Sequence, residues 1–182
     1  MRRKLAFKKT KLHMIKLLFV KNRIEYLKKQ GLFYHIGEGC LWQPYSIPSE
    51  PYLVSLGDNV KVTAGVRFIT HDITPAVFGW MGYPVHNECL YYMDKIVIGN
   101  NVMIGADSII MPGVTIGNNV IIAAGTVVSK DVPSGSVIAG APYKIIGTFD
   151  ELAKKRYMQC EARPCHLSTK QEIYDFFWKE KI

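Results

Sequence analysis

The sequence of 182 residues contains no apolar run long enough to cross a membrane. A transmembrane helix needs about 20 consecutive apolar residues, whereas the longest candidate, residues 14–20, is interrupted by Lys16. The basic N-terminal stretch is not followed by an uncharged apolar segment with a small-residue cleavage site, as a secretory signal peptide would be. We therefore expect a cytoplasmic protein.

Cysteine pairs with a recognisable spacing are also missing. No C-x-x-C motif occurs, and no Cys/His cluster has zinc-finger spacing. We expect reduced, unlinked thiols and no bound metal. The four cysteines are Cys40, Cys89, Cys160 and Cys165.

Acidic residues are scarce at one end of the chain. Residues 1–30 hold eleven of the 23 Lys and Arg residues but only one of the 15 acids, Glu25. The rest of the chain is nearly neutral, with twelve basic and fourteen acidic residues. A nucleic-acid-binding domain usually carries a basic face on its folded body, so we expect no nucleic-acid partner.

The chain does contain a strict six-residue repeat that starts at Ile98. An aliphatic residue leads each unit, and a small or β-branched residue follows four places later. Short strands with the leading aliphatic inward, separated by Gly, Asn or Asp at sharp corners, explain this spacing. Three corners close a turn of about 18 residues, so the period predicts a parallel β-helix. The units are IGNNVM, IGADSI, IMPGVT, IGNNVI, IAAGTV and VSKDVP.

Weaker copies of the repeat begin at Ile36, Leu56 and Val62. The first two lie 20 residues apart, so we expect a loop containing Pro44, Pro48 and Pro51 to bulge between them. Residues 71–95 do not repeat and are rich in aromatics, which predicts one large excursion from about five coils.

These motifs, together with "GTVVSKDVPSGSVIAGAP" at 125–142, resemble the hexapeptide-repeat acyltransferases over roughly residues 34–147. The branch it looks closest to contains the sugar O-acetyltransferases and the xenobiotic acetyltransferases. The resemblance implies an all-β solenoid, a left-handed parallel β-helix, and a homotrimer with its sites between subunits. The expected organisation is a basic helical arm (1–33), the β-helix domain (34–147, excursion 71–95) and a C-terminal helical segment (148–182).

The resemblance also implies a catalytic residue, His71, at the end of "RFITHD". A histidine at this position in the family is the general base that deprotonates the acceptor hydroxyl, since imidazole titrates near neutral pH. Asp72 either orients this imidazole or favours the turn. An acceptor-binding role is expected for at least one aromatic of the excursion, among Phe78, Trp80, Tyr83, Tyr91 and Tyr92. The substrate-binding set that we predict is Asp72, Trp80, Tyr83 and Tyr92.

Acetyl-CoA is the cosubstrate that the resemblance implies. Small residues at the coil corners allow the pantetheine arm to approach the backbone, and lysines suit the phosphates. Family members often have a tryptophan at the position of Met103, so the resemblance does not extend to an aromatic stacking contact at this position. The positions that match the donor site are Met103, Gly105, Ala106, Ala124, Ser129, Lys130 and Lys144.

Both ends of the chain predict helices. Residues 11–30 read as one helix closed by Gly31, with Leu12, Ile15, Phe19 and Tyr26 near one face. This helix either caps the first coil or, with residues 1–30 as a basic arm, rests on an anionic membrane at its inner face. Near the C-terminus, Ser168 or Thr169 is expected to cap a helix, with Gln171 or Glu172 completing a capping box. Its Tyr174, Phe177 and Trp178 are expected to pack against the prism or a neighbouring chain.

The leading hypothesis is an acetyl-CoA-dependent O-acetyltransferase for a sugar hydroxyl of a surface polysaccharide or its precursor. The alternatives are acetylation of an antibiotic or amino sugar, and a non-catalytic scaffold. A carbonic anhydrase on the same prism would need three histidines around zinc, and no second histidine falls in register with His71.

Overall fold

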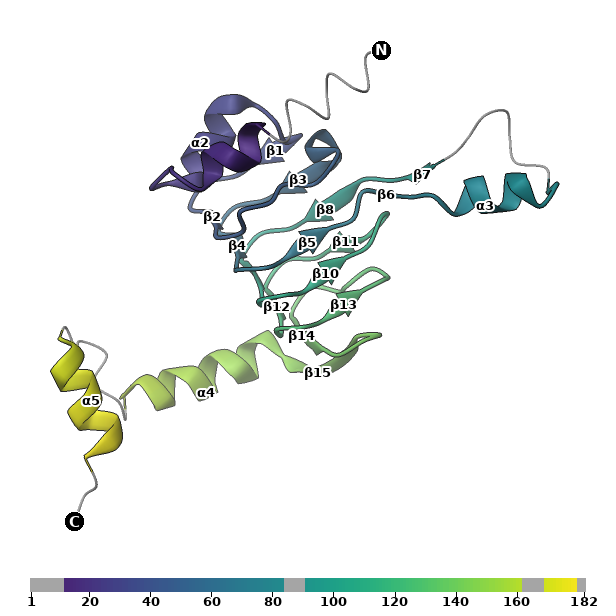
Figure 1. The fold of residues 1–182 in the computed structure, drawn as a ribbon. Coiled ribbons are helices and arrows are strands. Elements are labelled where there is room, and N and C mark those ends of the chain that lie inside the picture. Colours follow the sequence, from purple (N-terminus) through teal and green to yellow (C-terminus); the bar gives the residue numbers. More distant parts are fainter. Residues whose placement is uncertain (1–11, 84–90, 162–168, 180–182) are drawn as a thin grey trace. The chain divides into compact units, whose positions relative to one another are not determined.

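The computed structural model describes residues 12–83, 91–161 and 169–179. The chain divides into two compact units, Met1–Phe149 and Asp150–Ile182. The first unit contains all the strands (Figure 1). No helix among the described residues is long and apolar enough to span a bilayer.

The strands of the first unit form three mainly parallel sheets and one antiparallel ribbon. The four-stranded sheet contains β1 (His35–Ile36), β3 (Val54–Leu56), β8 (Ile96–Ile98) and β11 (Thr115–Ile116). The three-stranded sheet contains β5 (Arg67–Phe68), β10 (Ile109–Ile110) and β13 (Val127–Val128). The six-stranded sheet contains β2 (Leu41–Trp42), β4 (Lys61–Val62), β9 (Val102–Ile104), β12 (Val120–Ile122), β14 (Ser136–Ala139) and the antiparallel β15 (Lys144–Thr148). The ribbon pairs β6 (His71–Asp72) with β7 (Tyr92–Met93).

The spacing along the chain sets the register of these sheets. At one corner, Asn118 Oδ1 accepts from the Asn100 N–H, 18 residues earlier. The matching bond from the Glu38 N–H to Asp58 Oδ1 spans 20 residues, because the proline-containing loop and a short 3-10 helix, η1 (Pro51–Leu53), lie between. The bond from the Asp58 N–H to Asn100 Oδ1 spans 42 residues, because the excursion intervenes. Strands far apart in sequence therefore pair directly.

The predicted inward positions form the core. All six leading aliphatics and all six residues four places later are buried, which confirms the register predicted from the repeat. The two polar members satisfy their hydroxyls locally, since Ser108 and Thr126 both donate to the Ala123 carbonyl. Each fully buried isoleucine contributes about 1.5–3 kcal/mol relative to an exposed one. The leading residues are Ile98, Ile104, Ile110, Ile116, Ile122 and Val128, and the others are Val102, Ser108, Val114, Val120, Thr126 and Val132.

The mid-chain excursion leaves the sheets through the β6–β7 ribbon and carries a short helix, α3 (Thr74–Trp80) (Figure 1). No side chain of α3 is buried. Residues 84–90, which include Cys89, lie outside the described part of the chain.

The prediction of one continuous helix over residues 11–30 is wrong. Residues 12–17 are helical, a turn follows, and α2 covers Arg23–Gln30. Asn22 accepts from the Glu25 N–H and starts the second helix, while Arg23 Nε donates to the Leu17 carbonyl at the end of the first. Gly31 closes α2 in the left-handed conformation, as predicted. The break turns different residues inward from those expected, because Leu17, Ile24 and Leu27 are buried whereas Leu12, Ile15 and Phe19 are exposed.

The helix α4 (Phe149–Glu161) begins at the last residue of the first unit and belongs otherwise to the second, which also contains α5 (Lys170–Trp178). Thr169 and Glu172 form the predicted capping box at the start of α5. The side chains of Tyr174, Phe177 and Trp178 are exposed, so their packing against a partner stays a prediction. Residues 162–168, which include Cys165, lie outside the described residues.

Candidate active site

Glu50, Thr70 and His71 form a hydrogen-bonded cluster where β5 continues into β6. Glu50 Oε2 lies 2.7 Å from His71 Nδ1 and accepts a 2.6 Å hydrogen bond from Thr70 Oγ1. The Glu50 side chain is 18% exposed and the His71 side chain 29% exposed, while Thr70 is buried. The histidine is therefore fixed on one side and open on the other.

The contact with Glu50 determines which ring nitrogen of His71 can act as a base. An ionised carboxylate only accepts hydrogen bonds, so Nδ1 must carry a proton to donate to it. In the neutral imidazole, Nε2 then has a free lone pair. This tautomer, assigned from the hydrogen bonds, is the one that a general base needs.

Glu50 is the member of the cluster that sequence reasoning missed. It lies 21 residues before His71, in the loop that makes the first spacing 20 residues instead of 18. The long spacing and the prolines of this loop indicated that it departs from the repeat and has a role of its own. They did not identify Glu50.

Asp72 holds the turn after the ribbon and does not contact the imidazole by a hydrogen bond. Its Oδ1 accepts from both the N–H and the hydroxyl of Thr74, at 2.9 and 2.6 Å. These bonds, first the hydroxyl and then the N–H, lower the pKa of Asp72. Of the two roles predicted for Asp72, the geometry favours the turn.

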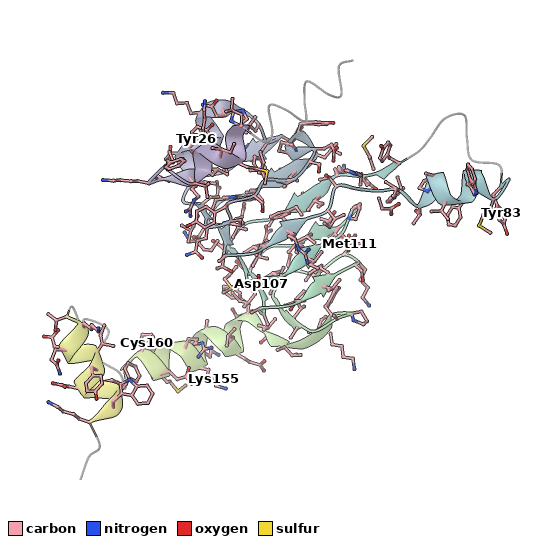
Figure 2. All side chains as sticks on the ribbon, viewed as in Figure 1. Tyr26, Tyr83, Asp107, Met111, Lys155 and Cys160 are labelled. Atoms are coloured by element: carbon pink, nitrogen blue, oxygen red, sulfur yellow. The ribbon has the colours of Figure 1, made fainter. Side chains whose placement is uncertain are left out.

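The aromatic residues of the excursion divide into two groups. The Tyr91 ring meets the His71 ring edge-on, with centroids 5.5 Å apart, and Tyr92 donates to Asp94 Oδ2 at 3.3 Å. The negative charge of Asp94 is the main cause that raises the pKa of Tyr92. Trp80 and Tyr83 lie at the end of α3 and just beyond it, exposed and away from the sheets (Figure 2). Tyr91 is therefore the aromatic that the structure brings to the histidine.

Three of the predicted donor-site residues meet at one stacked corner of the sheets. The Gly105 N–H donates to the Ile122 carbonyl, and the Gly125 N–H donates to the Ala106 carbonyl. A Cβ atom at Gly105 would lie 2.4 Å from the Ala124 nitrogen, so this corner tolerates no side chain there. The clash shows that Gly105 is buried in the stack, whereas Ala106 is half-buried and Ala124 is exposed. The small side chains of Ala106 and Ala124 leave room beside this corner for the extended arm of a thioester cosubstrate.

The other predicted donor-site residues lie around this corner. Met103 is half-buried on the outer face of β9, beside Ile121 of β12. Ser129 and Lys130 are exposed after β13, and the ammonium of Lys130 lies 5.4 Å from the Tyr143 ring centroid. Lys144 begins β15 and is also exposed. Two cations are therefore available for phosphate groups.

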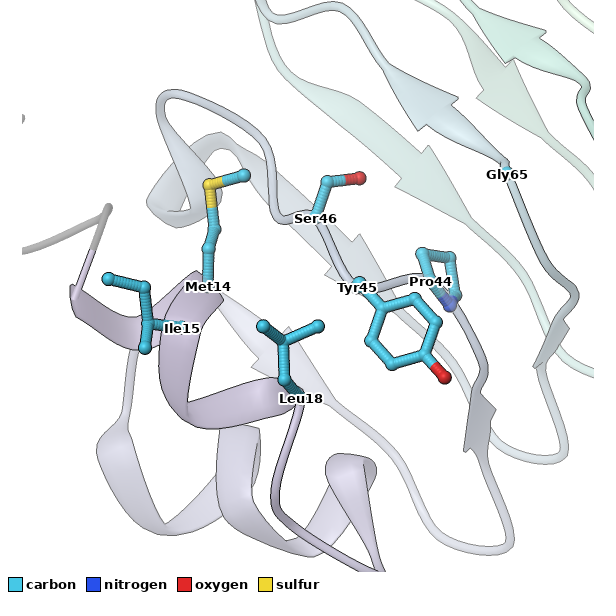
Figure 3. A pocket seen from close by; sticks show the side chains of 7 residues that line it. All are labelled: Met14, Ile15, Leu18, Pro44, Tyr45, Ser46 and Gly65. Atoms are coloured by element: carbon cyan, nitrogen blue, oxygen red, sulfur yellow. The ribbon is translucent and has the colours of Figure 1, made fainter.

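The described residues of the first unit form grooves of different size, two of which lie near its N-terminal helices and β5. The larger, of about 430 Å³, lies between the helical residues 12–17 and the loop after β2, and Met14, Leu18 and Tyr45 line it (Figure 3). The smaller, of about 190 Å³, lies between β5 and the loop that precedes Glu50. No group of three or more His, Cys, Asp or Glu side chains that could hold a metal occurs in the part of the chain that the structure describes.

Comparison with known proteins identifies the class. The family described as "Bacterial transferase hexapeptide (six repeats)" matches residues 95–130. Protein CapG of Staphylococcus aureus is 41% identical over 142 residues, which cover 76% of this chain and 80% of CapG. The chain belongs to the bacterial hexapeptide-repeat transferase family.

More distant relatives are named as acetyltransferases. The galactoside O-acetyltransferase of Escherichia coli K12 is 40% identical over 114 residues, covering 60% of this chain and 51% of that enzyme. A galactoside acetyltransferase structure in complex with coenzyme A superposes with a TM-score of 0.59 at 26% identity, covering 84% of each chain. A maltose O-acetyltransferase from Clostridium difficile 630 has the same fold, with a TM-score of 0.57 at 24% identity over 80% of this chain and 87% of that one.

Proposed function

We propose that this protein is an acetyl-CoA-dependent O-acetyltransferase that acts on a sugar hydroxyl, most directly one in a surface polysaccharide or its precursor. The observation that carries the proposal is the Glu50–His71 pair at the point where the chain leaves the sheets. The relatives named galactoside and maltose O-acetyltransferase support the sugar as acceptor and acetyl as the group transferred. Structures of such relatives hold coenzyme A.

In this proposal His71 Nε2 takes the proton of the acceptor hydroxyl. The oxygen attacks the thioester carbonyl, the carbon–sulfur bond breaks, and the proton passes from the imidazolium to the departing thiolate. Glu50 stabilises the imidazolium and keeps the ring in one orientation, with Thr70 holding the carboxylate. No acyl-enzyme is needed, and Glu50 acts as a positioning residue.

The donor would lie against the corner formed by Gly105, Ala106 and Ala124. The small side chains of half-buried Ala106 and exposed Ala124 support this placement, because they let an extended arm approach the backbone there. Lys130 and Lys144 would then pair with the phosphates of the nucleotide, with Ser129 and Met103 beside them.

We infer a β-helix of about five coils spanning residues 34–147, with helical segments 1–33 and 148–182; the 18-residue register supports the stacking, and the family supports the left hand. Membership of the family supports trimeric assembly, with sites between subunits. In such a trimer the donor corner of one subunit would complete the acceptor site of another. This would explain why His71 and the donor corner lie on different sheets of one chain.

The N-terminal arm would contact an anionic membrane. Leu12, Ile15, Leu18 and Phe19 are exposed, and Ile15 and Leu18 also line the larger apolar groove (Figure 3). The arm carries a large excess of cations over its single acid. An apolar surface among cations fits anionic lipid headgroups.

The test of the function is thiol release from acetyl-CoA with a panel of neutral sugars, acidic sugars, nucleotide sugars and antibiotics. We expect release that depends on a sugar and disappears in His71→Ala, while coenzyme A binding and assembly are unchanged. Release that depends on an antibiotic alone would reassign the acceptor. Normal release in His71→Ala would remove this residue as the base.

A further inference from the structure

The smaller groove is lined by residues that lie next in the chain to the Glu50, Thr70 and His71 cluster. Buried Trp42 and Phe68 line it, and exposed Ser49 and Arg67 line it as well. Its volume of about 190 Å³ corresponds to roughly six water molecules at about 30 Å³ each. It has room for a small substituent or a single ring.

Both walls of the groove lead to the catalytic cluster. Ser49 on one wall precedes Glu50, and Ile69 on the other precedes Thr70 and His71. The hydrogen bonds from Thr70 and His71 to Glu50 tie the two walls together at this end. A molecule with one group in the groove would therefore carry its neighbouring atoms toward the imidazole.

One hydrogen-bond donor beside the groove has no acceptor within the described residues and is open to a ligand. The Trp42 indole N–H also has no partner, but it is buried and closed to a ligand in the groove. The Arg67 guanidinium is exposed on the outer face of β5 and makes no ion pair or hydrogen bond in the described chain. No Asp or Glu lines the groove. This environment favours a ligand that is rich in acceptor oxygens.

We propose that this groove binds an anionic substituent of the acceptor, a carboxylate or a phosphate, with Arg67 as the residue that selects it. The inference rests on the proposed function, because it assigns the acceptor class to the same site. A planar guanidinium forms two parallel hydrogen bonds with either anion. Glu50 does not line the groove, and its Oε2 accepts hydrogen bonds from Thr70 and His71.

The test measures binding of three ligands by calorimetry: methyl glucuronide, methyl glucoside and a nucleoside diphosphate glucose. The proteins are wild type, Arg67→Gln and the control Lys154→Gln, which removes an exposed cation of α4 in the second unit. Wild type should bind at least one anionic ligand about 10- to 100-fold more tightly than the neutral glucoside, as expected for a charge-assisted bond. Arg67→Gln should lose this preference, Lys154→Gln should keep it, and Arg67→Lys should keep part of it.

A preference for the glucuronide alone would identify the carboxylate as the recognised group, and a preference for the nucleotide sugar alone would identify the phosphate. Equal binding of neutral and anionic ligands, or a preference that survives Arg67→Gln, would overturn the proposal. Arg67-dependent binding without acetyl transfer would refute the proposed function and leave the anion site standing. Transfer to neutral sugars with no anion preference would refute the anion site and leave the proposed function standing.

Discussion

Replacing Glu50 with alanine should lower kcat without weakening donor binding. The carboxylate makes a charge-assisted hydrogen bond of 2.7 Å to His71 at a position where both side chains are mostly buried. Such bonds contribute about 1.5–3 kcal/mol, which corresponds to a loss of about 10- to 150-fold in kcat. Thiol release at saturating acetyl-CoA and acceptor measures kcat, and titration of acetyl-CoA measures its KM, which should not change.

Glu50→Gln separates orientation from charge. The amide oxygen can still accept from Nδ1, but a neutral bond is about half as strong, so a loss of about 3- to 12-fold is expected. Glu38→Ala is the matched control, because Glu38 is an exposed glutamate whose ion pair with Lys28 lies on the surface. If Glu50→Ala kept full kcat, or if it raised the KM for acetyl-CoA with kcat unchanged, the assignment of Glu50 as a positioning residue would be refuted.

Four further predictions concern acetyl-CoA binding, the corner at Gly105, the turn held by Asp72 and membrane binding by the N-terminal arm. Lys130→Ala should raise the KM for acetyl-CoA about 10-fold but leave that for acetyl-dephospho-CoA unchanged; equal changes would exclude the 3′-phosphate as its partner. Gly105→Ala should destabilise by at least about 2 kcal/mol because of its steric clash, whereas Gly125→Ala, which has open space and a φ of 70°, should cost about 1 kcal/mol; denaturant unfolding measures both. Asp72→Ala should increase hydrogen exchange in α3 at neutral pH, because it removes the bonds to Thr74. Protonation of Asp72 has the same effect in the wild type, and because the pKa of Asp72 is lowered, the wild type should lose this protection only below about pH 4. Phe19→Ser should reduce sedimentation with anionic vesicles but not with zwitterionic ones, and unchanged sedimentation would leave the arm with a capping role alone.

The six-residue pattern predicted which side chains face inward, because in a stacked strand each inward position must be apolar or small. That rule is local, so Ile98 and its successors could be assigned without coordinates. The excursion was equally visible as a failure of the period. Continuous helicity from 11 to 30 was predicted wrongly, since propensity does not reveal that Arg23 closes one helix while Asn22 opens the next.

The repeat predicts the parallel stacking, the place where it is interrupted and the histidine at that place. It does not predict what the histidine contacts. Glu50 reaches His71 across 21 residues, Trp42 and Arg67 line one groove from different strands, and Gly105 meets Ala124 from the next corner. Periodicity specifies which way a side chain points, but the partner of a side chain depends on how loops of irregular length return to the stack. A loop with no period has no register to read, so its contacts are set only when the chain folds.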